Sequence, residues 1–449
     1  MAVPSVGSII IPSDILAAVA ADEAISGWLG GARLNSERVF VTVSAQIGSE
    51  TRYCGYTERL APHHAFNPLE RGYEERLVRW VKTSADFPAG EWIPAPELAG
   101  GLTLDLADLR EEGPCVCIVS TDSDSPRARG FAILSRDGKS KLLPLQTILM
   151  PVVQDPLAKL PAELAAALSG KTVILVGLGS GGGEIASNLA CAGVGKLVLF
   201  DDDRLLAENY VRHILTGRDL GRGKVLGVRD NLHERGLSTK VVTFTKNIVS
   251  YADDFRNAIV EHRPDLIICA TDSVNSRRLM NVCAIKLGVP LTVAGILDAG
   301  RIGEVVLVKP GKSACYECIR TRLATSLEVA DSPERSLSPY AEDGDPNLAS
   351  AAQRFDVGFV ASLATRASLS VLDPKTYPEL PADYVIWGRE ATCEYDAPFQ
   401  FQYPLTVNYV PVSMQPDCPV CGTLPKELEG IDIDATAAEI IAQLGPISE

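Results

Sequence analysis

A glycine-rich turn and the carboxylates that follow it are the residues in this sequence best suited to bind a nucleotide. The turn reads GLGSGGG and contains Gly177, Gly179 and Gly182. Glycines at this spacing allow a tight turn and a close approach of the backbone to a phosphate group. Asp201 and Asp203 come about 20 residues later, where an acid can accept hydrogen bonds from ribose hydroxyls. On its own, this pattern fits enzymes that use NAD as well as enzymes that use ATP.

The side chains after these carboxylates favour ATP. The apolar runs 173–176 and 197–200 predict buried strands before the glycine turn and before Asp201. Asn209, Arg212 and Lys224 supply an amide and two cations shortly after the second of these strands. A dinucleotide pyrophosphate is bound mostly by backbone amides, whereas the cleavage of a triphosphate requires cations where negative charge develops.

These residues resemble the pattern of the MoeB/ThiF/HesA family, the adenylating core of ubiquitin-activating enzymes. The family pattern is GxGGxG, an acid-x-acid pair, Asn-x-x-Arg-Gln and then a lysine, and His213 stands where the family usually has Gln. The resemblance implies that a C-terminal carboxylate attacks the α-phosphate of ATP, giving an acyl-adenylate and pyrophosphate. The matching residues are Gly177, Gly179, Gly182, Asp201, Asp203, Asn209, Arg212 and Lys224.

The family resemblance extends to a second acid. Asp272 follows a buried strand expected over 266–270, and Arg277 follows it shortly after. The resemblance implies that Asp272 binds the magnesium ion that accompanies ATP and that Arg277 helps to hold phosphate. A carboxylate at the carboxyl end of a parallel strand does face the crevice in which ligands bind. Asp272 is also suited to cap the helix expected next, and this role is compatible with the first.

Two CxxC motifs predict a metal centre. They comprise Cys315 and Cys318, and Cys418 and Cys421. Paired CxxC motifs are typical of a tetrahedral zinc site, and four thiolates leave no open position for catalysis. Their long separation matches the resembled family, and a redox role is the alternative.

A polar, acidic stretch over 319–354 is expected to form the crossover loop. In ubiquitin-activating relatives this loop carries the thiol that accepts the activated tail, and here that position falls near 347–352, where no cysteine stands. Three explanations remain open: adenylation alone, direct transfer to a cysteine of a partner, or a cysteine replaced by Ala or Ser. Cys393 is the nearest other candidate, although its strand-like surroundings favour a structural role.

Residues 1–150 are expected to form a smaller mixed α/β domain. Strand-like runs lie at 39–43, 115–119 and 131–134, and helix-like runs lie at 13–29 and 70–82. The stretch GEWIPAP resembles the JAB/MPN metalloprotease family, and so does GWLGG at 27–31. Trp92 and Pro96 match, Ile93 and Ala95 replace the two histidine ligands, and Asp105 and Asp108 stand at the Ser and Asp positions.

The JAB/MPN resemblance implies a domain that retains the shape and lacks the metal. Zinc in that family needs two imidazoles, and neither isoleucine nor alanine can donate an electron pair to it. His63 and His64 form the one histidine pair in the sequence. Since no Cys or carboxylate stands beside them at ligand spacing, a solvated loop is favoured over a metal site.

Composition indicates a globular protein. The chain has 449 residues, 46% of them apolar, and a formal net charge of −15, which argues against a broad nucleic-acid-binding face. No apolar run approaches the roughly 20 residues that span a bilayer, and the first residues lack the basic start of a signal peptide. We therefore expect a cytoplasmic protein that binds neither nucleic acid nor membrane.

The expected architecture is α/β: a Rossmann-like, mostly parallel sheet with helices on both faces, preceded by the smaller domain. The boundaries are 1–150 for the JAB-like domain, 151–424 for the adenylation domain and 425–449 for a tail with a short helix. MoeB-like enzymes begin with a helix whose arginine reaches the partner's ATP site. No arginine lies between Gly138 and Lys171, so this contribution is not expected here.

Four functional hypotheses follow. The first is ATP-dependent activation of a ubiquitin-like protein at its C-terminal glycine, in a bacterial conjugation pathway linked to antiphage defence. Its cofactors are ATP, magnesium and zinc, and its partners are a cysteine-containing conjugating enzyme and a second copy of the chain. The others are adenylation of a sulfur carrier for molybdopterin or thiamine synthesis, an NAD(P)-dependent oxidoreductase, and a non-catalytic scaffold.

Overall fold

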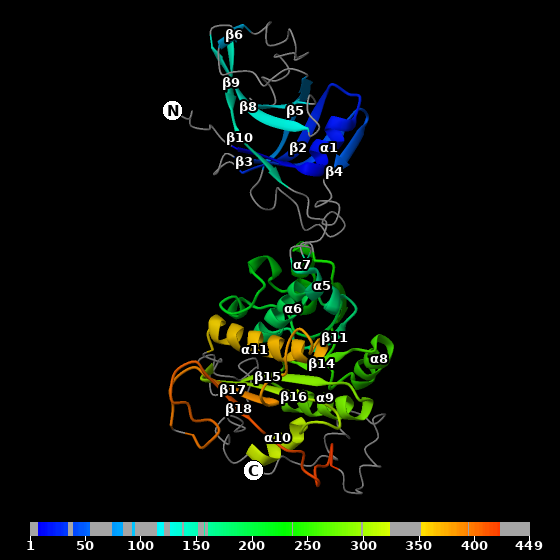
Figure 1. The fold of residues 1–449 in the computed structure, drawn as a ribbon, viewed down its shortest axis with the longest axis vertical. Coiled ribbons are helices and arrows are strands. Elements are labelled where there is room, and N and C mark those ends of the chain that lie inside the picture. Colours follow the sequence, from blue (N-terminus) through cyan, green and yellow to red (C-terminus); the bar gives the residue numbers. More distant parts are fainter. Residues whose placement is uncertain are drawn as a thin grey trace. The chain divides into compact units, whose positions relative to one another are not determined.

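The computed structural model divides the chain into two compact units, Met1–Pro156 and Leu157–Glu449, and each is described by itself (Figure 1). Within them, the structure describes residues 8–34, 39–53, 74–83, 92–94, 115–120, 126–136, 139–150, 157, 160–235, 237–297, 300–323, 352–393 and 395–422.

Unit 1 is built on one ten-stranded sheet, with strand order β10-β1-β3-β2-β5-β7-β8-β9-β6 and β4 paired to β3. Its one helix in the described residues, α1, buries Ile15, Leu16 and Val19 on one face. The elements are β1 Ser8–Pro12, α1 Ser13–Ala21, β2 Ser26–Leu34, β3 Val39–Ile47, β4 Glu50–Tyr53, β5 Glu74–Thr83, β6 Trp92–Pro94, β7 Cys115–Ser120, β8 Arg127–Arg136, β9 Lys139–Pro144 and β10 Gln146–Met150.

Two helix predictions in unit 1 are corrected. The helix expected over 70–82 is wrong, because 74–83 form β5, in which Val78 and Trp80 alternate into the core and the Trp80 indole donates to the Gln46 carbonyl at 3.2 Å. The helix expected over 13–29 ends at Ala21, since β2 begins at Ser26. At Gly27 a Cβ would lie 2.4 Å from the Gln46 carbonyl oxygen, so only glycine lets the strands approach this closely.

Several predictions for unit 1 fall on residues outside the described ranges. His63, His64, Ala95, Pro96, Asp105 and Asp108 are among them. The described ranges therefore contain too little of the motif to test the JAB/MPN resemblance, which stays a prediction.

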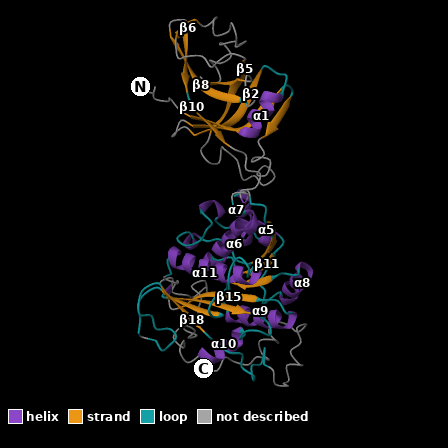
Figure 2. Ribbon diagram, viewed as in Figure 1, coloured by secondary structure: helices purple, strands orange, loops and turns teal. Residues whose placement is uncertain are grey.

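Unit 2 contains an eight-stranded sheet with helices on both faces, as Figure 2 shows. The strand order is β13-β12-β11-β14-β15-β16-β17-β18; the pairs from β13 to β15 are parallel and those from β15 to β18 are antiparallel. The strands are β11 Thr172–Val176, β12 Lys196–Phe200, β13 Lys240–Phe244, β14 Leu266–Cys269, β15 Leu291–Leu297, β16 Ile302–Val308, β17 Tyr384–Gly388 and β18 Thr406–Val410.

The helices of unit 2 form two layers because strand side chains alternate between the faces. Val173 and Leu175 of β11 join the core under α5, α6, α7 and α11, whereas Ile174 and Val176 join the core under α8, α9 and α10. The helices are α5 Ala162–Ser169, α6 Ser180–Ala192, α7 Lys224–Glu234, α8 Ala252–His262, α9 Val274–Leu287, α10 Tyr316–Leu323 and α11 Arg354–Leu372, with 3₁₀ turns η4 Ala207–Asn209 and η5 Gly217–Asp219. The predicted α/β fold class is confirmed for unit 2.

One helix in the described residues, α11, is long and apolar enough to cross a membrane by length and composition alone. Of its most apolar window, 61% is buried inside the protein, where Val360, Ala361 and Ala364 pack in the core of unit 2. This is the pattern of a core helix. The loop expected over 319–354 is shorter than predicted, since α10 continues to Leu323; residues 324–351 and the predicted tail helix lie outside the described residues.

Candidate functional site

The predicted nucleotide residues come together at the carboxyl ends of three neighbouring strands. The glycine turn follows β11, Asp201 follows β12 and Asp272 follows β14. β11 pairs with β12 on one side and with β14 on the other, so the chain order reverses at β11. A crevice at such a reversal is where open α/β sheets bind ligands.

Two of the three glycines in the turn are required because a side chain would clash, and the third borders open space. Gly177 has φ +87°, and a Cβ there would lie 2.7 Å from the Ala270 carbonyl oxygen; a Cβ on Gly182 would lie 1.8 Å from the Gly177 carbonyl oxygen. These two positions accept only glycine. At Gly179, the residue before α6, a Cβ would meet no atom within 4 Å. The helix N-terminus thus faces open space, which suits an anion.

The Asp201 carboxylate ties the end of β12 to the glycine turn. Its Oδ2 accepts from the Leu178 amide at 2.6 Å, and its Oδ1 accepts from the Asp203 amide at 2.8 Å. Burial raises the pKa of Asp201 to about 6, against the opposing effects of the Lys224 charge and the Leu178 amide. The group therefore changes its charge near neutral pH.

Lys224 and Asp203 form an ion pair beyond the carboxyl end of β12. Lys224 Nζ lies 2.7 Å from Asp203 Oδ2, and the side chains are 7% and 62% exposed. The Lys224 amide, at the start of α7, also donates to the Asp203 carbonyl at 2.9 Å. The lysine is thus held in place by a group that is itself in contact with solvent.

Asn209 shapes the turn that carries Arg212. The Asn209 side chain is buried, and its Oδ1 accepts from the Leu206 amide at 3.0 Å. Its carbonyl accepts from the amides of Arg212, at 3.1 Å, and His213, at 2.8 Å. Arg212 is half-buried. The structure supports a positioning role for Asn209, and direct contact of Asn209 or Arg212 with ATP stays a prediction.

The structure places Asp272 in contact with solvent and Arg277 in the protein interior. The cap of α9 is Ser273, whose Oγ accepts from the Ser276 amide at 3.3 Å, so the alternative role of Asp272 as the cap is wrong. Asp272 is exposed beyond the end of β14. Arg277 is buried: its Nη1 lies 2.9 Å from Glu304 Oε1, and its Nε donates to the Thr271 carbonyl at 3.0 Å. Its predicted phosphate contact stays a prediction.

Sequence reasoning missed Glu304, the partner of Arg277. Glu304 is buried in the middle of β16, and its Oε2 accepts from the Tyr384 hydroxyl at 3.3 Å. The available signal was a lone carboxylate in the apolar run IGEVVLV, since a buried charge requires a partner.

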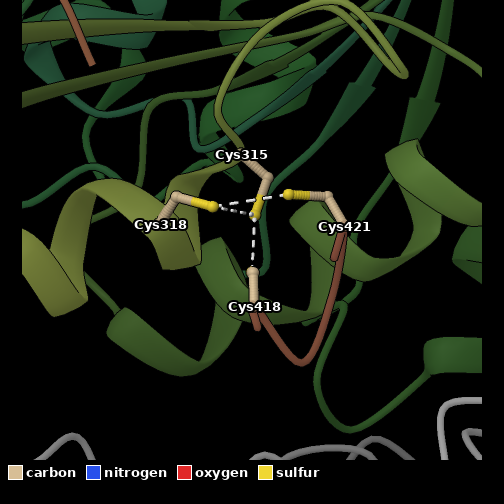
Figure 3. A group of neighbouring side chains, drawn as sticks. All are labelled: Cys315, Cys318, Cys418 and Cys421. Carbon is tan, nitrogen blue, oxygen red and sulfur yellow. Dashed lines mark hydrogen bonds between the residues drawn. The ribbon is translucent and has the colours of Figure 1, made fainter. Parts of the chain in front are cut away.

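The four cysteines of the CxxC motifs converge on one point (Figure 3). The Sγ–Sγ distances are 3.9 Å for Cys315–Cys318, 3.6 Å for Cys315–Cys418 and 3.4 Å for Cys318–Cys421. These distances are too long for disulfide bonds, which measure about 2.05 Å. Thiolates at about 2.3 Å from a tetrahedral zinc lie roughly 3.8 Å apart, so this donor set fits zinc. Hydrogen bonds from the neighbouring thiols lower the pKa of Cys318, which favours a thiolate.

Helix α9 supports this cysteine centre. Arg278 donates to both carboxylate oxygens of Glu317, at 2.7 and 3.1 Å, and both side chains are buried. Asn281 Oδ1 accepts from the Tyr316 amide at 3.0 Å. Backbone amides of Gln415 and Val420 lie within 3.5 Å of Cys318 and Cys418 sulfur.

Comparison with known proteins agrees with this arrangement. The family model described as "ThiF family" matches residues 154–390. The chain is 29% identical over 276 residues to the Escherichia coli (strain TW11681) ATP-dependent ubiquitin transferase-like protein Cap2, covering 58% of the chain and 42% of that protein. It is 31% identical over 156 residues to ubiquitin-like modifier-activating enzyme 5 of Aedes aegypti, covering 33% of the chain and 39% of that protein.

The chain spans less than half the length of these relatives. Among solved structures, E. coli MccB aligns at 21% identity with a TM-score of 0.43, covering 58% of the chain and 69% of MccB. The family match covers more than half of the chain and runs from before β11 to the end of β17, including the glycine turn and the predicted cations. The chain therefore belongs to the ThiF family, as its sequence predicts.

Proposed function

We propose that the crevice binds ATP and that the chain adenylates the C-terminal carboxylate of a ubiquitin-like protein. The observation that carries the proposal is the placement of Lys224 and Asp203 beside the glycine turn, which Asp201 joins to the same rim. Membership of the ThiF family supports it. So do the names of the relatives, an ATP-dependent ubiquitin transferase-like protein and a ubiquitin-like modifier-activating enzyme.

The proposed reaction is an in-line transfer at the α-phosphate. A carboxylate oxygen of the partner's C-terminal glycine forms a bond to the α-phosphorus, the bond from that phosphorus to the bridging oxygen breaks, and pyrophosphate leaves with the electron pair. The products are an acyl-adenylate and pyrophosphate. Negative charge develops on the leaving group, so fixed cations at the rim lower the barrier.

Each residue at the crevice has an assigned part. The N-terminus of α6, next to Gly179, faces the phosphates, and Lys224 and Arg212 neutralise them. Asp201 accepts from the ribose hydroxyls. Asp272, exposed at the end of β14, would hold magnesium, which supplies further charge neutralisation when bound.

Lys224 would exchange partners during binding. In the nucleotide-free protein its charge is balanced by Asp203, which is 62% exposed and so can move away at little cost. A triphosphate carries more negative charge than one carboxylate. The ion pair thus keeps Lys224 in place until the nucleotide arrives.

We also propose that the cysteine centre holds a structural zinc. Cys315, Cys318, Cys418 and Cys421 supply four sulfur donors at tetrahedral spacing, and that set leaves no position for a substrate. The metal would fasten the segment around Cys421 to α10.

The partners are proposed from the same chemistry. The acyl-adenylate is an activated group, and we propose that it passes to the cysteine of a conjugating enzyme. A homodimer in the cytoplasm and a bacterial conjugation pathway that acts in antiphage defence complete the proposal; similarity to Cap2 supports the bacterial pathway. Cys191 and Cys393 are the exposed cysteines among those whose burial the structure describes, and a thioester on this chain would use one of them or a cysteine outside that set.

ATP–pyrophosphate exchange tests adenylation directly. The full chain is incubated with ATP, magnesium, labelled pyrophosphate and candidate ubiquitin-like proteins that end in glycine. We expect exchange into ATP with a cognate partner, and a loss of about 10²–10³-fold in Lys224→Ala, because one charge-stabilising group is removed.

Lys309→Ala is the matched control. Lys309 is also ion-paired, with Glu379 at 3.2 Å and Asp383 at 2.9 Å, and it follows Val308, which pairs with Leu291 at the amino end of β15. It thus lies at the opposite edge of the sheet and should leave exchange unchanged. Thermal stabilisation by NAD and none by magnesium–ATP would contradict the proposal and favour an oxidoreductase.

A further inference from the structure

The His213 imidazole lies between two backbone groups from different segments. The residue is 2% exposed, its Nε2 lies 2.7 Å from the Leu178 carbonyl oxygen, and its Nδ1 lies 3.0 Å from the Leu215 amide nitrogen. Leu178 belongs to the glycine turn, and Leu215 lies beyond the turn that carries Arg212. One side chain thus joins the two segments of the proposed ATP site.

These contacts fix the proton on the imidazole. An amide N–H can only donate, so Nδ1 must accept from Leu215 with its lone pair; a carbonyl can only accept, so Nε2 must donate to Leu178. His213 is therefore neutral, with its hydrogen on Nε2. Leu178 is held at both ends, its amide by Asp201 and its carbonyl by His213.

We propose that His213 is a positioning residue, whose neutral imidazole fastens the glycine turn to the segment that carries Arg212. Its effect on ATP rests on the proposed function above, whereas the fastening itself does not. The residue touches backbone alone in these two contacts, so it would set where the turn stands relative to the cations without contacting the nucleotide.

The fastening should depend on pH. A second proton, on Nδ1, would face the Leu215 N–H and remove that hydrogen bond. Burial lowers the pKa of His213 from its ordinary 6.5, and the nearby charges of Lys224 on α7 and Arg212 on its own segment lower it further. The hydrogen bond to the Leu178 carbonyl and the charge of Asp219 of η5 oppose them in part. On α6, the residue next to the His213 ring is Gly183, which has no charged side chain. The clamp, meaning these two hydrogen bonds of the His213 ring, should be complete at neutral pH. As the pH falls below this depressed pKa it should lose the Leu215 bond that orients the ring, while Nε2 still donates to Leu178.

Two measurements on nucleotide-free protein test the clamp. In ¹⁵N-histidine-labelled chain at pH 7.5, we expect the His213 signals of a neutral ring protonated on Nε2. We expect His213→Leu to speed amide hydrogen exchange in 177–183 by about tenfold, because one carbonyl anchor is lost. His213→Gln should restore slow exchange, since an amide can both donate and accept.

Thr239→Val is the matched control, because it also removes a buried hydrogen bond to a carbonyl, at 2.9 Å from Val194, elsewhere in unit 2. It should leave exchange in 177–183 unchanged. A charged or Nδ1-protonated ring at pH 7.5, or equal exchange in the wild type and His213→Leu, would overturn the proposal.

Magnesium–ATP binding by calorimetry separates this proposal from the proposed function. We expect His213→Leu to bind about tenfold more weakly, and the difference between the wild type and His213→Gln to grow as the pH is lowered below 6.5. Asp201 titrates in both proteins, so it cancels in that difference. Absence of ATP binding in the wild type with an intact clamp would contradict the function alone; full binding by His213→Leu would contradict the positioning role.

Discussion

The proposed nucleotide site and the cysteine centre differ in how their charged and polar groups are held, although both lie in unit 2. At the proposed site, Asp203 is 62% exposed, and we propose that its partner Lys224 exchanges it for the phosphates of the nucleotide. In the cysteine centre, three of four cysteines are buried, Cys421 is half-buried, and all four sulfurs lie within 4.8 Å of one another. In the proposal, a ligand can displace Asp203 from Lys224, whereas the four cysteine sulfurs surround a single point.

This difference separates two kinds of charged residue that look alike in the sequence. Lys224 and Arg277 both belong to the predicted ATP motif. Lys224 is paired to an exposed acid at the crevice, whereas Arg277 is paired to the buried Glu304. Burial of the partner, which a motif does not contain, is what differs between these two cations.

Loss of the metal is the largest effect we expect. Cys318→Ser, or removal of zinc by a chelator, should unfold much of unit 2, because a structural zinc contributes about 10–16 kcal/mol, comparable to the whole stability of a typical domain. Metal analysis should give one zinc per chain, and circular dichroism should follow the loss of structure. Cys393→Ser, at an exposed cysteine, is the control and should retain both. An unchanged melting temperature in a metal-free chain would show that the cysteine centre does not need a metal, and the contrast with the proposed nucleotide site would disappear.

The next largest effect should come from the support beneath the cysteine centre. Glu317→Gln leaves the Arg278 guanidinium buried without its counter-charge, which should lower the free energy of unfolding by about 3–5 kcal/mol in urea titrations. Glu379→Gln breaks the pair of an acid that is 66% exposed and should cost less than about 1 kcal/mol. Equal losses in the two variants would show that burial does not set these energies.

A pH-dependent effect should appear at the crevice. Because burial raises the pKa of Asp201 from 3.8 to about 6, the folded chain binds this proton more tightly than the unfolded chain does. The contribution of Asp201 to the free energy of unfolding is fully present below about pH 4. It should fall by about 1–3 kcal/mol as the pH rises through 6. Urea unfolding from pH 4.5 to 7.5, compared with Asp201→Asn, isolates the trend; parallel curves would contradict it.

The smallest effect on the free energy of unfolding should come from breaking the Lys224–Asp203 ion pair. Asp203→Asn removes the partner of Lys224, and because Asp203 is exposed while Asp201 remains nearby, the free energy of unfolding should change by less than about 1 kcal/mol. Thermal unfolding measures it, with Asp202→Asn, at the exposed neighbour, as the control. A large loss would mean that the ion pair is structural and that the crevice resembles the cysteine centre after all.

The parts that the sequence predicted are those set by local rules. The buried strand expected over 173–176, which is β11, the glycines at 177 and 182 and the four-cysteine cluster follow from apolar runs, backbone sterics and ligand spacing. The pairing of Arg277 with Glu304 depends on how β16 lies beside β15, which no local pattern contains. The helix prediction over 70–82 failed because the charged residues at 74–76 interrupt the apolar alternation that Val78 and Trp80 follow in β5.

The 14-residue helix α9 begins at Val274, two residues after Asp272. Further along the helix, Arg278 and Asn281 fasten it by hydrogen bonds to the segment between Cys315 and Cys318. At 1.5 Å per residue it forms a stiff rod about 21 Å long. Asn281 is the eighth residue of α9, so the fastening lies only about 10 Å from the end beside Asp272. We expect oxidation of the thiols to loosen that fastening and to disturb the position of Asp272. On the proposed function, we expect thiol oxidation to weaken ATP binding although none of the four thiols lies beside the glycine turn, and reductant to preserve that binding during purification.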